Sequence, residues 1–334
     1  MDVHALGWIA LASIVIALIT IDIVGHVRTP HAPTLKEASR WTAAYVALAV
    51  GFGFLVWAIW GLRYAGEYWA GWVTEWSLSL DNLFVFVIII SAFRVPREYQ
   101  QKVLLSGIII ALVLRLIFIL IGAALIAKAS WIFYIFGLWL LYTAYGQIRE
   151  GVGDDEDDEY QETRFVRIVR KVFPVTDGFL SDKLLHRHGG KTYLTPMLLV
   201  ILALGSTDLM FAFDSIPAIF GLTKEPFLVF AANAFALLGL RQLYFLIDGL
   251  LERLVYLHYG LAAILGFIGV KLVLHAMHEN SLGFINGGQG FNVPDIGIPT
   301  SLGFIVITLL ITVIASILKS RSDAKADVTV SSSP

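Results

Sequence analysis

Apolar stretches of the length that spans a bilayer, about 17 to 25 residues, recur along the whole chain. They lie near residues 5–25, 41–62, 70–93, 103–127, 130–148, 195–220, 226–247, 254–276 and 301–318. Of the 334 residues, 57% are hydrophobic and 15% are charged, and the mean hydropathy is +0.77, which is far from the composition of soluble domains. We therefore predict an all-α polytopic protein of the cell membrane with about nine transmembrane helices.

Lysine and arginine are unevenly shared between the loops on the two sides of the membrane. The loops after the first, third, fifth and seventh stretches, together with the C-terminal tail, carry 18 of them, and the opposite loops carry only Arg63, Lys128 and Lys224. Cytoplasmic loops are the basic ones in membrane proteins. We expect the N-terminus outside and the C-terminus in the cytoplasm. Residues 1–4 lack the basic start of a cleaved signal peptide, so the first helix is expected to be retained.

A polar motif in the third apolar stretch recurs in the sixth with identical spacing. The two copies are Thr74, Glu75, Asp81 and Asn82, and Thr207, Asp208, Asp214 and Ser215. Each carboxylate in the bilayer core costs roughly 2.5 to 3.5 kcal/mol, even on the lenient insertion scale. The structural alternative is that these acids only pair with buried cations, but a duplicated pattern of four acids favours a functional site.

An arginine also recurs in the apolar stretch that follows each motif, as Arg115 and Arg241. The third to fifth helices therefore correspond to the sixth to eighth. Since each unit has three helices, the second enters the membrane from the other side, which predicts inverted repeats. The expected organisation is peripheral helices at 1–65, a first repeat at 66–148, a cytoplasmic loop at 149–193, a second repeat at 194–276, an external glycine-rich loop at 277–300, and a last helix with its tail at 301–334.

Residues seven apart share a helix face, so Glu75 lies with Asn82 and Thr74 with Asp81, and the second copy repeats this relation. Inverted repeats would bring the two polar stripes together near the middle of the bilayer. Carboxylate, amide and hydroxyl oxygens suit hard divalent cations such as Mn²⁺ or Ca²⁺. The candidate ligands are Glu75, Asp81, Asn82, Asp208, Asp214 and Ser215, with Thr74 and Thr207 as secondary candidates.

Charge balance extends this prediction from binding to transport. Four carboxylates against Arg115 and Arg241 leave a charge of −2, which one divalent cation or two protons would neutralise. Burial and mutual repulsion favour protonated carboxylates in the empty site, so metal binding would release protons, as antiport requires. Met210 could add a thioether, and His275 and His278 could bind metal at the external end, although packing and interfacial roles are the simpler interpretation of all three.

The 149–193 loop contains two contrasting segments. Residues 154–159 are all acidic, which is typical of a solvated charge run. After them, Phe165, Ile168, Val169 and Val172 recur at helical spacing among arginines and a lysine. That pattern predicts a helix lying along an anionic inner leaflet.

The two motifs, Glu75 to Asn82 and Asp208 to Ala218, resemble the paired signatures of the TerC family of membrane proteins, including its Alx branch. The resemblance extends over about residues 5–320. It implies a role in metal-ion homeostasis, chiefly Mn²⁺ export, with the motif acids, Asn82 and Ser215 as ion ligands. The family name comes from tellurite resistance, but a cage of carboxylates would repel an oxyanion.

Two other classes of function remain open. Asp81 and Asp214 could form the dyad of an intramembrane aspartyl protease, but the Gly-x-Gly-Asp context of those proteases is missing and the other two acids would be unexplained. A non-transporting stress-response scaffold would use the acidic loop instead. We expect no enzyme activity, no prosthetic group and no nucleic-acid partner. The sequence has no cysteine, which excludes thiolate ligands.

Overall fold

The computed structural model describes residues 1, 3–27, 33–129, 131–150, 164–176, 178–179, 183–188, 191–247, 255–280, 282, 285–294 and 296–331, without the side chains of some of them, including Asp81. The elements are α1 (Ala5–Asp22), the π-helical turn η1 (Ile23–Val27), α2 (Leu35–Trp60), α3 (Leu62–Ala92), α4 (Arg97–Lys128), α5 (Ile132–Glu150), α6 (Arg164–Val172), β1 (Leu185–His188), β2 (Lys191–Leu194), α7 (Pro196–Phe220), α8 (Pro226–Ile247), α9 (Leu257–His278), the 3₁₀ turn η3 (Asn286–Gly288) and α10 (Ile298–Ser331).

Each apolar stretch of the sequence falls on a helix. Among the described residues, eight helices are long and apolar enough to cross a membrane, namely α1, α2, α3, α4, α7, α8, α9 and α10. The remaining stretch, 130–148, corresponds to α5, a helix of 19 residues that includes three tyrosines and a glutamine. The prediction of an all-α polytopic membrane protein is confirmed.

Local sequence signals explain where several helices begin. The Thr34 side chain accepts a hydrogen bond from the Glu37 backbone N–H at 3.3 Å and so caps α2. Proline opens α7, at Pro196, because the first turn of a helix needs no backbone donor there. Gly61 separates α2 from α3 with a φ of 95°, a conformation that favours glycine.

The centre of the bundle is α8, in which every residue from 227 to 244 is buried. It packs against α2, α3 and α4, and also against α1 and α7. One continuous apolar core joins these helices. A helix that is apolar on every side is expected at such a central position.

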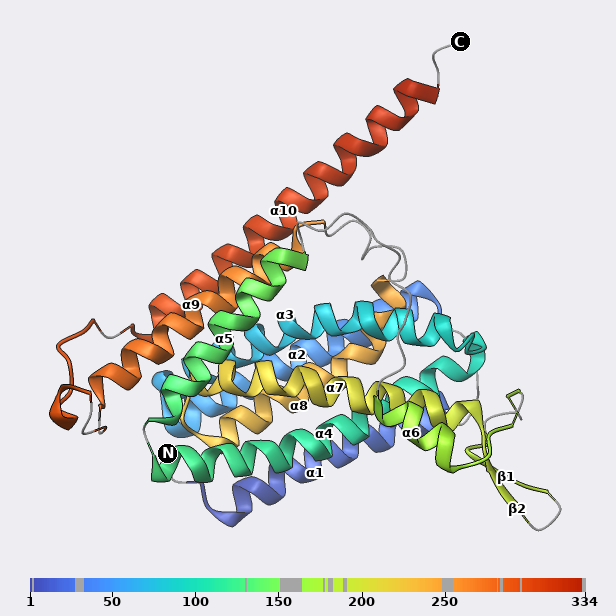
Figure 1. The fold of residues 1–334 in the computed structure, drawn as a ribbon, viewed down its shortest axis with the longest axis horizontal. Helices are drawn as coiled ribbons and strands as arrows, with labels where there is room; N and C mark the ends of the chain where they lie inside the picture. Colours follow the sequence, from blue (N-terminus) through green and yellow to red (C-terminus); the bar gives the residue numbers. More distant parts are fainter. Residues whose placement is uncertain are drawn as a thin grey trace.

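A second group of helices, α5, α9 and α10, runs obliquely across the first (Figure 1). It has its own apolar core, to which α3 and α7 contribute. The crossing of α5 and α9 is close: a Cβ atom on Gly137 would lie 2.9 Å from the Gly269 carbonyl oxygen, and one on Gly269 would lie 3.0 Å from that of Gly137. Small residues permit this contact between membrane helices.

Helix contacts follow the exchange that the predicted repeats require. In the predicted repeats α3 corresponds to α7, α4 to α8 and α5 to α9. A contact between α3 and α8 should therefore have a counterpart between α7 and α4, and both contacts are present. The α5–α9 pair is unchanged by the exchange and is also present. These contacts are compatible with the exchange, but the inverted repeat itself, including the opposite orientation of its halves in the membrane, stays a prediction.

Residues 149–193 contain more structure than the sequence indicated. The expected amphipathic helix is present as α6, but strands β1 and β2 form an antiparallel hairpin that no sequence pattern suggested. The acidic run at 154–159 lies outside the described residues.

Candidate functional site: buried carboxylates around Arg115

The two motif copies lie on α3 and α7, which contact each other and are both packed against α8. Glu75 of α3 is 0% exposed and Asp208 of α7 is 1% exposed. Arg115 of α4 is also fully buried. Charged side chains at such depth are retained only when they are paired and hydrogen-bonded.

Arg115 supplies that pairing to both carboxylates. Its Nε donates to Asp208 Oδ2 at 3.1 Å and its Nη2 to Asp208 Oδ1 at 3.3 Å, a two-pronged contact. Its Nη1 forms an ion pair with Glu75 Oε1. One guanidinium therefore joins an acid of each motif copy.

Two neutral oxygen atoms complete the surroundings of this guanidinium. Nη1 of Arg115 donates to Asn233 Oδ1 of α8 at 2.6 Å and to Ser215 Oγ of α7 at 3.1 Å. Asn233 is held in place by its own amide, which donates to the Val229 carbonyl at 3.0 Å. The site thus draws side chains from α3, α4, α7 and α8.

The remaining residues of the first motif are buried on α3. Thr74 is 0% exposed and donates its hydroxyl to the Ala70 carbonyl at 2.8 Å, and Asn82 is 3% exposed. In the second copy Thr207 is buried as well. The side chain of Asp81 lies outside the described residues, so the prediction of one cage with four acids stays a prediction.

Asp214 points to a different neighbour from Asp208. Its Oδ1 accepts a hydrogen bond from Trp139 Nε1 of α5 at 2.8 Å, and the carboxylate is only partly buried. Asp214 lies six positions after Asp208 on the helix, so the two side chains point in directions about 120° apart. Asp208 therefore belongs to the core around Arg115, and Asp214 belongs to the contact between α7 and α5.

Met210 is 63% exposed and Phe213 is 51% exposed on the outer face of α7. This arrangement does not bring the Met210 thioether to the carboxylates of the site.

Arg241 has different partners from Arg115. Its Nη2 pairs with Asp22 Oδ1 of α1 at 2.7 Å, and its Nη1 donates to Gln101 Oε1 of α4 at 3.2 Å. Arg241 lies eight residues beyond Asn233 on α8, which is about 12 Å along the helix axis. These contacts make Arg115 the countercharge of Glu75 and Asp208, and Arg241 the countercharge of Asp22.

His275 and His278 end α9 close to a second group of charges. Lys224 Nζ lies 3.1 Å from Glu279 Oε1, and His275 Nε2 lies 3.4 Å from Glu279 Oε2. Lys224, Glu279 and the ring of Phe133 line a pocket of about 370 Å³ beside α4. His275 also packs edge-on against Phe133, so the interfacial role fits its contacts.

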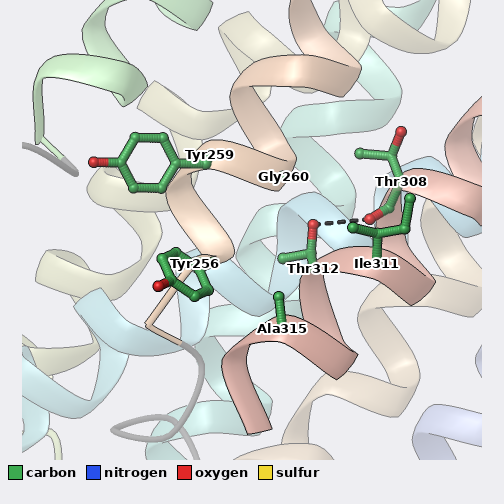
Figure 2. Close-up of a pocket in the computed structure, with 7 residues that line it drawn as sticks. All are labelled: Tyr256, Tyr259, Gly260, Thr308, Ile311, Thr312 and Ala315. Carbon is green, nitrogen blue, oxygen red and sulfur yellow. Dashed lines mark hydrogen bonds between the residues drawn. The ribbon is translucent and has the colours of Figure 1, made fainter. Parts of the chain in front are cut away.

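Another pocket is lined by residues at the start of α9 and by residues of α10 (Figure 2). Its wall includes two tyrosine rings and a Thr312 hydroxyl that donates to the Thr308 carbonyl at 2.8 Å. The lining residues are Tyr256, Tyr259, Gly260, Thr308, Ile311, Thr312 and Ala315. None of these side chains is a carboxylic acid or an amine, so this pocket adds nothing to a cation site.

Among the described side chains, no three His, Asp or Glu residues gather closely enough to hold a metal ion. Glu75 and Asp208 instead converge on a protein cation. The same carboxylate oxygen atoms could bind another cation only after Arg115 moves away, and protonation of the carboxyl groups would oppose that binding.

Sequence reasoning missed four residues that the structure brings into these polar contacts, namely Asp22, Gln101, Trp139 and Asn233. Asp22 and Asn233 interrupt apolar stretches, and an isolated polar residue in a transmembrane segment was an available signal. Trp139 had no such signal, because an indole is common in membrane helices.

Comparison with known proteins identifies similar sequences over nearly the whole chain. Residues 60–324 match the family described as "Integral membrane protein TerC family". An uncharacterized membrane protein of Mycobacterium tuberculosis is 48% identical over 326 residues, covering 97% of this chain and 82% of the relative.

Two more distant relatives extend the comparison. An uncharacterized membrane protein of Myxococcus xanthus is 35% identical over 322 residues, covering 96% of this chain and 94% of the relative. The protein named "Putative membrane-bound redox modulator Alx" of Escherichia coli (strain K12) is 37% identical over 295 residues, covering 84% of this chain and 90% of the relative. No solved structure matches this chain significantly.

Proposed function

We propose that this chain, which belongs to the TerC family of integral membrane proteins, transports a divalent cation across the membrane in exchange for protons. The substrate we propose is Mn²⁺, with Ca²⁺ as the alternative of similar ligand preference. Its oxygen ligands would come from the two motif copies, and no prosthetic group is required.

One observation carries the proposal: Glu75 and Asp208, from the two motif copies, are buried together at one guanidinium. A protein that needed only to hold its helices together could do so with apolar contacts, since a buried ion pair adds little net stability. Ionisable groups inside a transmembrane bundle are instead typical of ion and proton pathways.

Arg115 has a specific role in the proposed cycle. Its guanidinium occupies oxygen atoms of both Glu75 and Asp208. An entering divalent cation would compete for these oxygens, and displacement of the guanidinium would be the step that admits it. When the metal leaves, Arg115 and protons would restore neutrality.

The contacts of Arg241 change the expected charge balance. Arg241 pairs with Asp22, so Arg115 is the countercharge left for the motif acids. If Asp81 and Asp214 join Glu75 and Asp208 around the bound metal, the four acids and Arg115 carry a charge of −3 rather than −2. A divalent cation would then leave −1, and one retained proton would complete neutralisation. We therefore propose that one motif carboxyl group stays protonated in the metal-bound state.

The name of the Alx relative refers to redox modulation. For this chain the absence of cysteine from the sequence argues against thiol chemistry of its own. A cation transporter can change the redox state of a cell indirectly through the metals that it removes, so the two descriptions are compatible.

The test is metal flux in proteoliposomes that contain the purified full chain, with a Mn²⁺-sensitive dye and a pH-sensitive dye inside. We expect Mn²⁺ uptake with opposite proton movement for the wild type. Asp208→Asn and Glu75→Gln should abolish both. Glu98→Gln is the matched control, because Glu98 is an exposed acid at the start of α4.

The outcomes separate the alternatives. Unchanged uptake by Asp208→Asn and Glu75→Gln would refute the site, and uptake without proton movement would refute the coupling. The scaffold alternative holds instead under two conditions: the wild type moves no divalent cation, and cells that gain metal resistance from the full chain lose it when residues 154–159 are deleted.

A further inference from the structure

The segment between the two predicted repeats is strongly basic after its acidic run. Residues 164–194 contain seven lysines and arginines and two aspartates. We use the name basic platform for the described parts of this segment. They are α6 with residues 173–176, and the β1–β2 hairpin with residues 183–184. The platform lies at the end of the bundle where α7 begins (Figure 1).

Hydrogen bonds hold the parts of the platform together and join it to the residue before α7. The Leu194 N–H donates to the Pro174 carbonyl at 2.9 Å, and the Thr176 N–H donates to the Leu194 carbonyl at 2.9 Å. Thr195, next to the first residue of α7, donates its hydroxyl to the Lys183 carbonyl at 2.6 Å. Only one residue separates strand β2 from α7, so the hairpin is held at the level where a membrane-spanning helix starts.

Helix α6 presents apolar side chains on the face opposite its buried contact. Val166 is 0% exposed and α6 packs against α7. Ile168 and Val172 are four residues apart and so share one face of the helix. They point about 160° and 120° away from Val166, respectively. Ile168 is 60% exposed and Val172 is 65% exposed. No part of the described chain covers this apolar face, so lipid or another partner would have to bury it.

Exposed basic residues surround these apolar side chains. Arg167, Arg170 and Lys171 are exposed on α6. Arg187 is exposed on β1, and Lys183 is exposed just before β1. Leu185, also on β1, adds a further apolar side chain that is 52% exposed. Apolar side chains bordered by lysine and arginine, at the depth where helices leave the bilayer, form the pattern of an interfacial membrane anchor.

We propose that the basic platform docks on anionic phospholipid headgroups of the leaflet beside it, with Ile168 and Val172 inserted among the acyl chains. Charge complementarity favours this occupant, and so does continuity with α7, because the leaflet necessarily reaches the level at which α7 begins. The proposal does not depend on metal transport or on which side of the membrane carries the platform.

The test uses the absence of native cysteine from the sequence. Ile168→Cys in the full-length protein is labelled with an environment-sensitive fluorophore and placed in nanodiscs of phosphatidylcholine, alone or with one third phosphatidylglycerol. We expect a blue-shifted emission and several-fold stronger quenching by spin-labelled lipid in the anionic discs, both reversed by high salt.

Two controls define the result. Leu62→Cys reports the start of α3, away from the platform, where Leu62 is 63% exposed, and its emission should not depend on lipid charge. Adding Lys171→Gln and Arg187→Gln to the Ile168→Cys protein should remove most of the lipid-charge effect while leaving the folded bundle intact, because both side chains are exposed.

Emission at position 168 that is independent of lipid charge and of salt would overturn the proposal. A salt-sensitive blue shift that already occurs in neutral discs and disappears on deletion of residues 154–159 would also overturn it, because the acidic run of the chain would then be the occupant.

Discussion

Arg115 is the residue on which the buried contacts of both motif copies depend. Its five described contacts reach Glu75, Asp208, Ser215 and Asn233, which lie on three helices other than its own. Removing one partner of a buried ion pair leaves the other charge without compensation, which costs more than the pair contributes.

The first prediction is that Arg115→Ala destabilises the protein by about 3 to 5 kcal/mol, because two carboxylates lose their countercharge. The measurement is thermal or chemical unfolding in detergent. Adding Asp208→Asn to Arg115→Ala should recover part of the loss, since one uncompensated charge is then removed. If Arg115→Ala alone were as stable as the wild type, the role of Arg115 as countercharge would be contradicted.

The second prediction concerns Trp139, whose indole N–H donates to Asp214. Trp139→Phe should cost about 1 kcal/mol or less of stability, because the bond lies at a partly exposed carboxylate. It should nevertheless slow cation flux if Asp214 is a ligand, since the orientation of the carboxylate is lost. Trp131→Phe, at an exposed indole before α5, is the control. Equal flux in both variants would remove Trp139 from the site.

At the scale of elements, α5 and α9, two helices of the second group, contact each other through Gly137 and Gly269. On each side, a Cβ atom added to the glycine would lie within 3.0 Å of a backbone carbonyl oxygen of the other helix, and a backbone cannot rotate away as a side chain does. The contact therefore tolerates no larger residue without separation of the helices.

The third prediction is that Gly269→Leu destabilises the protein by at least about 1 to 3 kcal/mol, the usual cost of overpacking, and loosens α5 from α9. Hydrogen exchange of α5 and thermal unfolding would measure the effect. Gly146→Leu is the matched control, because nothing lies within 4 Å of a Cβ atom there. Similar losses in the two variants would show that helix glycines in general, not this contact, are responsible.

At the scale of the whole molecule, the arrangement in the membrane rests on the distribution of lysine and arginine. The fourth prediction is that residues 149–193 face the cytoplasm and residues 277–300 face outward. In intact cells a membrane-impermeant thiol reagent should label Gly288→Cys and not Asp157→Cys. Labelling of Asp157→Cys but not of Gly288→Cys would show the opposite topology. As a control, both cysteines should react in permeabilised cells.

The sequence by itself determined the helices and their membrane character. Apolar length and composition are local properties, so each of the nine stretches falls on a helix, and the hydrophobic–basic alternation at 164–172 identified α6. It also identified Glu75, Asp208 and Arg115 as residues with a buried charge, because an ionisable group in an apolar stretch is visible without knowing its partner.

Only the tertiary structure decided which charges meet. Arg115 and Arg241 have similar sequence surroundings, yet one faces the motif acids and the other faces Asp22 of α1. Asp208 and Asp214 lie on one helix, yet they face α4 and α5 respectively. The physical reason is that periodicity gives the direction of a side chain round its own helix, whereas its partner depends on the rotation, depth and neighbours of other helices, which distant parts of the chain supply.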